Sequence, residues 1–354
     1  MDLEQRYALV TRNTEELVTD GELRTLLTSG SQPSAYIGFE PSGLVHIGWA
    51  LVTAKIRDLC DAGFKVIVFW ADWHAYINDK LGGDIENIRT CARYMEDCFR
   101  ALGVPEDRVE FRYASEILDS IDYWEKVLKV AKVTSLSRVK RAMTIMGRSE
   151  DEAEVDSSKL FYPILQVTDI FCMDVDLAYA GLDQRRAHML ARDAAEKLGW
   201  KKPIALHTPL LPGLSGGDRM NPAASKMSKS NPDSSINIHD TPDDIRRKMG
   251  KAFCPMEAEE ADTNPVLMIC KHVLFPSLGV LQIDRPEKFG GPISFGSYEE
   301  LTDVYFAGKL HPMDLKKGVA EGLIRYLEPV DAYFAKSPKN LDDMRGILKE
   351  LGKI

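Results

Sequence analysis

The segment Ala35-Tyr36-Ile37-Gly38-Phe39-Glu40-Pro41-Ser42-Gly43-Leu44-Val45-His46-Ile47-Gly48 predicts the architecture of this chain. Its apolar start, 35–39, is typical of a buried strand, and residues 40–43 form a turn signal. A helical pattern follows over about 46–62, and the apolar run KVIVFWA at 65–71 predicts a second strand. Two continuously apolar strands joined by a helix are the unit of a parallel α/β sheet.

The rest of the first 238 residues extends this alternation. Further strands are expected at 109–113, 175–180 and 204–211, and helices at 3–29, 84–102, 121–147, 161–171 and 184–198. Residues 220–235 are rich in Ser, Lys, Asn and Pro and predict a loop. Beyond it the alternation stops, and helices are expected at 241–254, 264–274, 312–328 and 341–352. We therefore predict two domains, an α/β domain at 1–238 and a mainly helical domain at 239–354.

Composition excludes several classes of protein. Of the 354 residues, 44% are hydrophobic and 28% are charged, which is ordinary for a globular protein and excludes disorder, collagen and coiled coil as the main architecture. The sequence contains no apolar run of about 18 residues, so it predicts no membrane helix. The N-terminus lacks a signal-peptide layout, and a cytoplasmic location is therefore expected. The six cysteines form no CxxC pair and have no zinc-ligand spacing, so we expect reduced thiols and no structural metal.

The first strand–helix turn carries the first chemical signal. Neither G-x-G-x-x-G nor a P-loop is present, which argues against a dinucleotide-binding dehydrogenase and a P-loop NTPase. Gly38 lets backbone approach a ligand, and His46 and Gly48 fall in the expected first helical turn, where free N–H groups suit a polyphosphate. The alternative is an ordinary turn whose histidine caps a helix.

The second signal is Lys226-Met227-Ser228-Lys229-Ser230, in the expected loop. Two ammonium groups and two hydroxyls there can bind a triphosphate as charge moves onto departing pyrophosphate. Taken alone, this segment is equally typical of a solvated basic loop.

Together, the two segments resemble the signatures of class I aminoacyl-tRNA synthetases in both order and spacing, His46 and Lys226 being 180 residues apart. Trp49 departs from the histidine that more often ends the first signature, which puts a nucleotide contact from this position in doubt.

Six further stretches are similar to tyrosyl-tRNA synthetases of the archaeal and eukaryotic branch. They are AYIGFEPSG at 35–43, ADWHAY at 71–76, YPILQVTD at 162–169, GLDQRRAHMLAR at 181–192, RPEKFG at 285–290 and HPMDLK at 311–316. The resemblance runs from about residue 33 to 328. Many members of this branch carry KMSSS where this chain has KMSKS.

The resemblance implies a set of tyrosine-binding residues. Tyr36 and Asp169 would hold the phenol of the substrate, Tyr162, Gln166 and Gln184 its ammonium group, and His74 would line the same pocket. Spacings of four and three put Tyr162, Gln166 and Asp169 on one helix face, where polar groups facing a sheet are costly unless they bind something. A hydrogen-bonded core cluster is the alternative.

The resemblance also implies a Rossmann-like catalytic domain and its ATP site. His46, Lys226 and Lys229 would be catalytic. The expected ATP contacts are Gly38, His46, Gly48, Asp183, Lys226, Met227, Ser228, Lys229 and Ser230. Asp183 would accept from the ribose hydroxyls, although Asp is also a favoured helix N-cap. Mg²⁺ would arrive with ATP rather than in a protein cage.

Partners follow from the same resemblance. Seven cations and no acid lie between Lys126 and Arg148, a local footprint for phosphates in a chain of net charge −9, or else a solvated helix face. An insertion at about 78–160 would contact the tRNA acceptor stem and the second subunit of a homodimer. Arg141 and Arg185 would reach the first base pair, and Phe289 and Asp314 the anticodon.

The sequence thus predicts a tyrosine–tRNA ligase. Tryptophanyl-tRNA synthetase, and a non-catalytic paralogue that binds tRNA, are the two alternatives. For Asp314 the alternative to an anticodon contact is helix capping, since an Asp at the start of a helix is also a good capping residue.

Overall fold

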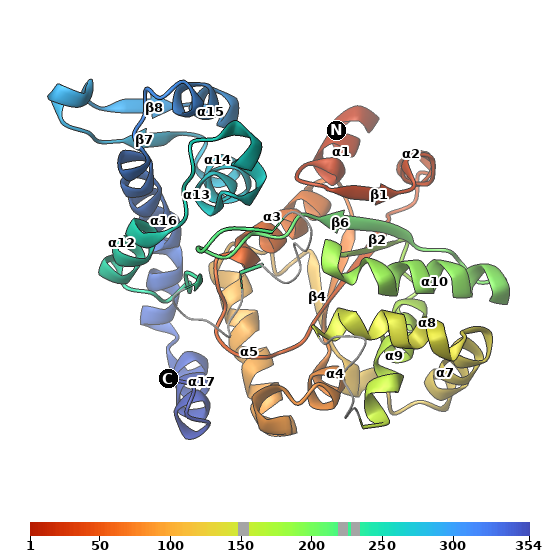
Figure 1. The fold of residues 1–354 in the computed structure, drawn as a ribbon. Helices are drawn as coiled ribbons and strands as arrows, with labels where there is room; N and C mark the ends of the chain where they lie inside the picture. The colour runs from red at the N-terminus through yellow and green to blue at the C-terminus, as the bar shows by residue number, and fades with distance from the viewer. Residues whose placement is uncertain (148–155, 219–225, 228–233) are drawn as a thin grey trace.

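The computed structural model describes residues 1–147, 156–218, 226–227 and 234–354 (Figure 1). A six-stranded sheet runs through the larger part of the molecule in the order β1-β6-β5-β2-β3-β4. Its strands are β1 (Glu16–Val18), β2 (Ser34–Phe39), β3 (Lys65–Trp70), β4 (Val109–Tyr113), β5 (Leu177–Gly181) and β6 (Ile204–Thr208). All pairs are parallel except β1–β6, which confirms the predicted α/β class.

The centre of the sheet is the junction of β2 and β5. The two strands pair only at Ala35–Leu177 and Tyr36–Ala178, although β2 continues to Phe39 and β5 to Gly181. The chain also changes direction of winding here, because β3 and β4 extend to one side and β5 and β6 to the other. Ligands of open parallel sheets bind outside the carboxyl ends of the strands at such a point.

Helices cover both faces of the sheet, as the apolar strands predict. One face packs on α3 (Gly48–Asp61) and α5 (Ile85–Ala101), the other on α7 (Ile121–Val133), α9 (Ser158–Cys172) and α10 (Arg185–Leu198). Shorter elements connect them: α4 (Asp72–Ile77), η1 (Lys80–Gly83), α6 (Ala114–Ile117), α8 (Leu136–Ala142), η2 (Met143–Met146) and η3 (Leu182–Gln184). The described residues include no helix that is both long and apolar enough to cross a bilayer.

The N-terminal prediction of one helix over 3–29 is wrong. The segment folds as α1 (Leu3–Thr11), β1 and α2 (Asp20–Thr28). β1 pairs in antiparallel register with the edge strand β6, and Thr19 then caps α2 through its hydroxyl. Three residues are too few for a period-two pattern, so only pairing with β6 reveals the strand.

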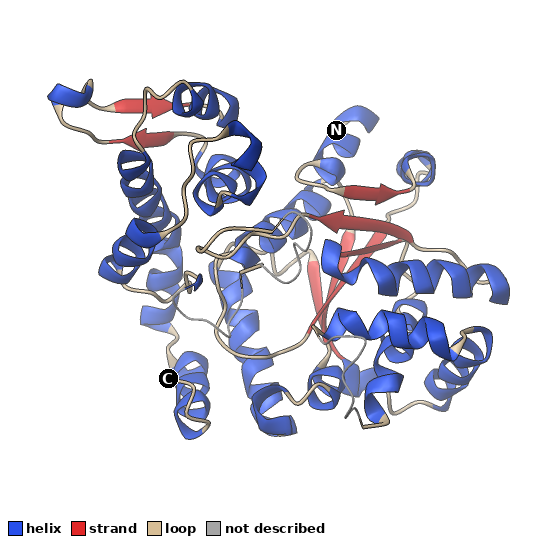
Figure 2. Cartoon of the chain, viewed as in Figure 1, coloured by secondary structure: helices blue, strands red, loops and turns tan. Residues whose placement is uncertain are grey.

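The C-terminal part is mainly helical, as Figure 2 shows. Its helices are α12 (Pro242–Lys251), η5 (Ala258–Thr263), α13 (Pro265–Ile269), η6 (Cys270–Leu274), α14 (Phe275–Leu278), η7 (Glu287–Phe289), α15 (Tyr298–Phe306), α16 (Pro312–Lys336) and α17 (Lys339–Glu350). The sequence analysis missed an antiparallel ribbon of β7 (Leu281–Ile283) and β8 (Ile293–Phe295).

A buried carboxylate on α5 joins this part to the sheet domain. Asp97 accepts hydrogen bonds from the Tyr333 hydroxyl of α16 at 2.8 Å and from the Asn340 amide of α17 at 2.7 Å. The guanidinium of Arg100, one turn along α5, lies 3.1 Å from the same carboxylate. Three donors therefore converge on one side chain that is only 7% exposed.

We predict that Asp97→Ala lowers the free energy of unfolding by about 2 kcal/mol, because it leaves the half-buried Tyr333 and Asn340 donors without their acceptor. Asp61→Ala is the matched control, since its ion pair with Arg108 is half exposed and contributes less than about 1 kcal/mol. Thermal unfolding of both variants followed by circular dichroism measures the difference. Equal shifts in melting temperature would contradict the role of Asp97.

Candidate functional site

The carboxyl edge of the sheet collects most of the predicted site residues. His46 follows β2, His74 lies in α4 directly after β3, and Asp183 lies in η3 directly after β5. Because parallel strands end at the same edge, residues from three distant segments are brought together there.

A group of buried polar side chains, which we call the polar cluster, lies beside this edge. Its members are Tyr36, His74, Tyr123, Tyr162, Gln166 and Asp169. Asp169 stands at its centre and is only 1% exposed. Its Oδ1 accepts the Tyr123 hydroxyl at 2.7 Å, and its Oδ2 lies 3.1 Å from His74 Nε2. The face of α9 predicted from spacing is therefore turned inward.

Tyr123 was missed by the sequence analysis. It lies on α7, 46 residues before Asp169, and its buried neighbours Val127 and Val130 form an ordinary core stripe. Only the packing of α7 on α9 brings the hydroxyl to the carboxylate. No pattern in the sequence distinguishes Tyr123 from a core tyrosine.

Several polar atoms of the cluster have no hydrogen-bond partner among the described residues. They are both ring nitrogens of His74, Oε1 of Gln166 and Oδ2 of Asp169. His74 Nε2 and Asp169 Oδ2 lie at an ion-pair distance of 3.1 Å, but without the geometry of a hydrogen bond. A buried polar atom left unpaired costs about 1–3 kcal/mol, so the cluster is suited to a ligand that supplies the missing partners.

Electrostatics define the protonation states in this cluster. Burial, and then the Asp169 carboxylate, raise the pKa of Tyr36 well above 10, so its hydroxyl remains a donor. Burial lowers the pKa of His74, but attraction to Asp169 outweighs that effect and the net pKa is raised above 6.5. Burial and the Glu40 carboxylate raise the pKa of Tyr162 as well.

Gln166 connects the cluster to the start of α10. Its amide Nε2 donates to Gln184 Oε1 at 3.3 Å, and Gln184 in turn donates to the carbonyl of Ile145 at 3.0 Å. This orients Oε1 of Gln166, the unpaired atom, away from Gln184. Tyr162 packs edge-on against His74, with ring centroids 5.0 Å apart.

Gly38 shares a face of β2 with Tyr36. A Cβ built on Gly38 would collide with the Tyr36 hydroxyl, so a glycine is needed here for Tyr36 to lie along the strand. Gly38 was predicted to contact ATP. The polar cluster also requires a glycine at this position, because any side chain would displace the Tyr36 ring.

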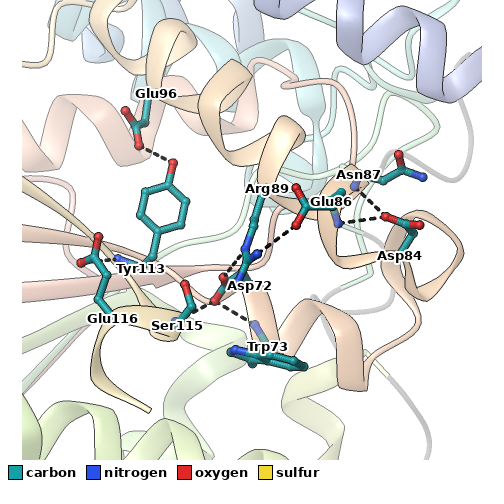
Figure 3. A network of polar contacts seen from close by, with 10 residues as sticks. All are labelled: Asp72, Trp73, Asp84, Glu86, Asn87, Arg89, Glu96, Tyr113, Ser115 and Glu116. Atoms are coloured by element: carbon teal, nitrogen blue, oxygen red, sulfur yellow. Dashed lines mark hydrogen bonds and ion pairs between the residues drawn. The ribbon is translucent and has the colours of Figure 1, made fainter. Parts of the chain in front are cut away.

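His74 is positioned by a second network, shown in Figure 3. Asp72, fully buried, accepts from the backbone N–H groups of Trp73 at 3.0 Å and Ser115 at 3.1 Å. Arg89 of α5 approaches the same carboxylate at 3.4 Å. Asp72 thus ties α4, which carries His74, to the ends of β3 and β4 and to α5.

The turn at Val45–Ile47 differs slightly from the prediction. α3 begins at Gly48, so His46 lies just before the helix rather than in its first turn. The His46 Nδ1 accepts the Gly48 N–H at 3.1 Å, which leaves the ring proton on Nε2. A Cβ on Gly48 would come within 2.8 Å of the His46 ring, so this glycine makes room for the histidine. Trp49 packs its ring on Phe39, at 4.9 Å between centroids.

The segment that follows the second signature pairs with the turn of the first through its backbone. Ile47 N–H donates to Ile236 O at 2.9 Å and Ile238 N–H donates to Val45 O at 3.0 Å. Of the signature itself, Lys226 and Met227 are described, whereas Ser228, Lys229 and Ser230 lie outside the described residues. Lys226 forms an ion pair with Asp183, and Met227 is buried in the main core. Asp183 makes no capping hydrogen bond to α10.

The predicted nucleic-acid residues lie in two other places. Arg141, on α8, lines an open groove of about 430 Å³ with three more basic side chains: Lys132, Arg138 and Lys197. Arg185, exposed at the start of α10, binds Glu16 of β1 through both carboxylate oxygens at 2.8–2.9 Å. The predicted basic cluster also included Arg148, which lies outside the described residues.

Phe289 and Asp314 lie far from the sheet, in the C-terminal part. Phe289 is 57% exposed, and Lys288 lies over its ring at 4.9 Å. Asp314 is in the first turn of α16, but His311 is the residue that caps this helix. Arg285 binds the carbonyls of Gly291 and Lys309, which ties the Phe289 turn to the segment before α16.

Comparisons with known proteins agree on one relationship. Residues 28–328 match the family described as tRNA synthetases class I (W and Y). The tyrosine–tRNA ligase of Aeropyrum pernix is 52% identical over 340 residues, 93% of each chain. The crystal structure of tyrosyl-tRNA synthetase with L-tyrosine from Pyrococcus horikoshii is 44% identical with a TM-score of 0.90, over 98% of this chain and 100% of that one. Tryptophanyl-tRNA synthetase of Aeropyrum pernix shares the fold alone, at 21% identity and a TM-score of 0.67 over 92% of this chain and 84% of that one.

We predict that Asp169→Asn lowers the pKa of His74, because burial then acts without the nearest carboxylate. A histidine NMR titration measures the change. Asp174→Asn is the matched control, since that carboxylate is 81% exposed, and it should leave the titration unchanged.

The ion pair of His74 and Asp169 also leads to a prediction for the pH dependence of stability. A pKa raised by folding stabilises the protein most below the unfolded value of 6.5, and this stabilisation is lost as the pH rises through the folded pKa. The part of the wild-type advantage over Asp169→Asn that depends on the His74 charge should therefore shrink with rising pH. An advantage that grows with rising pH in this range would contradict the assignment.

Proposed function

The chain belongs to the class I tRNA synthetases, in the branch whose members are tyrosine–tRNA ligases, and we propose on this basis how its residues divide the reaction. It is an aminoacyl-tRNA ligase that joins L-tyrosine to tRNA(Tyr). Tyrosine first reacts with ATP to give tyrosyl-adenylate and pyrophosphate. A hydroxyl at the 3′ end of the tRNA then takes the tyrosyl group, and AMP is released.

The unpaired atoms of the polar cluster carry the assignment of the tyrosine site. Oδ2 of Asp169 is a buried acceptor that would accept a hydrogen bond from the substrate hydroxyl. The hydroxyl of Tyr36 would bond the same phenol. Oε1 of Gln166 is a second buried acceptor, suited to the substrate ammonium with Tyr162 and Gln184 beside it. A site built to bond a hydroxyl rejects phenylalanine strongly, because its own polar groups would stay unpaired.

Activation needs positioning and charge stabilisation rather than a covalent intermediate. The tyrosine carboxylate attacks the α-phosphorus of MgATP, and pyrophosphate leaves. We assign His46 Nε2 and the Lys226 and Lys229 ammonium groups to the negative charge that develops on these phosphates. Asp183 would bind the ribose hydroxyls, and Lys226 would exchange its Asp183 partner for phosphate when ATP enters.

ATP would enter as its magnesium complex, since the phosphates of ATP supply ligands for Mg²⁺. Gly38 and Gly48 would contact the nucleotide along the turn, and Met227, Ser228 and Ser230 from the second signature. Among the residues that the structure describes, no three His, Cys, Asp or Glu side chains gather as a metal site.

Two surfaces are assigned to tRNA. The groove lined by Lys132, Arg138, Arg141 and Lys197 has the charge to bind the acceptor arm, and Arg141 and Arg185 would reach the first base pair. Residues 239–354 are assigned to the anticodon, with Phe289 stacking on its first base and Asp314 accepting from that base. Residues 1–238 would then be the catalytic domain, with an insertion at about 78–160.

An exposed apolar stripe on α7 supports the homodimer. Ile121, Trp124 and Leu128 are 82%, 44% and 70% exposed, and spacings of three and four place them on one face of the helix. A second copy of the chain, offering the same stripe across a two-fold axis, would cover this face. We assign the enzyme to the cytoplasm.

The test of this function is ATP–pyrophosphate exchange with tyrosine, tryptophan and phenylalanine. Tyrosine alone should support rapid exchange; exchange with tryptophan instead would favour the sister enzyme, and exchange with none of the three a non-catalytic paralogue. Tyr36→Phe and Asp169→Asn should each lower the tyrosine-to-phenylalanine ratio of kcat/KM by about tenfold, as expected for one lost hydrogen bond. An unchanged ratio in both variants would overturn the assignment of the polar cluster.

We further predict that Asp314→Ala impairs charging of tRNA and spares ATP–pyrophosphate exchange, because anticodon and acceptor end lie far apart in a tRNA. Since His311 caps α16, the melting temperature should be nearly unchanged. The defect should shrink when the first anticodon base is replaced. Asp303→Ala, an exposed acid on α15, is the control. Equal defects on every anticodon would reject base recognition.

A further inference from the structure

The phosphate-binding turn at Val45–Ile47 is held from two sides. The segment that follows the second signature pairs with its backbone on one side, through Ile236 and Ile238. On the other side lies α5, where Tyr94 accepts the Val45 N–H on its hydroxyl oxygen at 3.2 Å. Both Val45 and Tyr94 are fully buried, so water cannot replace this bond.

The Tyr94 hydroxyl has a second partner. His239 Nε2 lies 2.9 Å from it, and His239 comes directly after the segment that pairs with the turn. Because burial lowers the pKa of His239 to about 4, its ring is neutral near pH 7 and Nε2 can accept. The Val45 amide donates to the Tyr94 oxygen, and the Tyr94 hydroxyl donates to His239 Nε2 in the tautomer that carries its proton on Nδ1. Cys98, also on α5, lies beside the same hydroxyl.

His239 is itself held by the C-terminal part of the chain. Its ring packs edge-on against Phe334 of α16, with centroids 4.7 Å apart. Tyr333, the residue before Phe334, donates a hydrogen bond to Asp97. Asp97 lies one turn beyond Tyr94 on α5. α16 and α17 both pack on α5, and Figure 1 shows these helices on the same side of it. The end of α16 thus fixes both α5 and His239.

We propose that Tyr94 and His239 are positioning residues for ATP activation, which hold the turn that carries His46 in its working place. Neither touches the reacting atoms. The proposal rests on the proposed function, in which His46 binds the phosphates. Removing the Tyr94 hydroxyl leaves the Val45 N–H buried without a partner, so the turn must shift to find one. A small displacement of a catalytic donor is enough to slow such a reaction substantially.

The effect should separate the two substrates. Among the described residues, the polar cluster that would hold tyrosine makes no hydrogen bond to Tyr94 or His239. The backbone amide that Tyr94 holds, by contrast, belongs to the residue before His46. Tyr94→Phe should therefore lower kcat/KM for ATP by about tenfold in ATP–pyrophosphate exchange. The KM for tyrosine should stay within about twofold of the wild-type value.

Variants of His239 make the test sharper. His239→Leu removes the acceptor and should reproduce the Tyr94→Phe defect. His239→Gln offers an oxygen close to the place of Nε2 and should restore most of the ATP activity. The double variant Tyr94→Phe with His239→Leu should be no worse than either single variant, since both break one chain of bonds.

Tyr326→Phe is the matched control. Its hydroxyl is buried on α16 beside Thr53 of α3, and among the described residues it makes no hydrogen bond to the Val45–Ile47 turn, so its loss should leave both KM values unchanged. Defects that add in the double variant, a KM for tyrosine that rises as much as that for ATP, or a His239→Gln variant as poor as His239→Leu would each overturn the proposal.

The outcome is separable from that of the proposed function. A wild-type enzyme without exchange activity would reject the function, whereas an active wild type with unaffected variants would reject only the positioning role. Equilibrium binding of ATP to the same variants, measured without tyrosine, tests the role of Tyr94 and His239 whether or not the wild-type enzyme catalyses exchange. Tyr94→Phe should bind ATP more weakly than wild type and Tyr326→Phe should bind it equally well.

Discussion

The early end of the β2–β5 pairing is the constraint on which the rest of the molecule depends. The two strands share only two register positions before they part, because the helices that follow them, α3 and α10, pack on opposite faces of the sheet. Several of the residues that would bind ATP or tyrosine belong to these two strands or follow them directly. Tyr36 and Gly38 lie on β2, His46 follows it, and Asp183 follows β5. The sheet supplies a rigid edge, and the loops supply the chemistry.

Three consecutive side chains at the start of α10 illustrate how the free enzyme keeps its polar groups satisfied. Asp183 pairs with Lys226, Gln184 with Gln166, and Arg185 with Glu16, so each neighbour is held by a different segment of the chain. In the proposed function the same three residues meet ATP, tyrosine and tRNA. Each substrate would then replace an internal partner rather than bind to an empty group, which lowers the cost of exposing charge between turnovers.

The polar cluster behaves differently, because several of its atoms have no internal partner. A carboxylate that is 1% exposed is tolerated only because Tyr123 bonds it and His74 lies beside it. This arrangement would make the site specific for a ligand with a hydroxyl group, since any other ligand leaves Oδ2 of Asp169 buried and unpaired. Asp72 and Gly38 support it from outside, one by fixing α4 and the other by leaving space for Tyr36.

Sequence by itself determined the α/β class, the strands 35–39 and 65–71, the inward face of α9 and the family to which the two signatures point. These follow from local properties: apolar runs, helical spacing and turn residues act over a few positions, and the resemblance rests on short contiguous motifs. Tertiary structure alone decided that 3–29 contains a strand, that Tyr123 bonds Asp169 and that His239 bonds Tyr94. In each case the partner lies far away in the chain, and a three-residue strand or a core tyrosine carries no periodicity of its own. Long-range packing selects such contacts, and no local pattern encodes them.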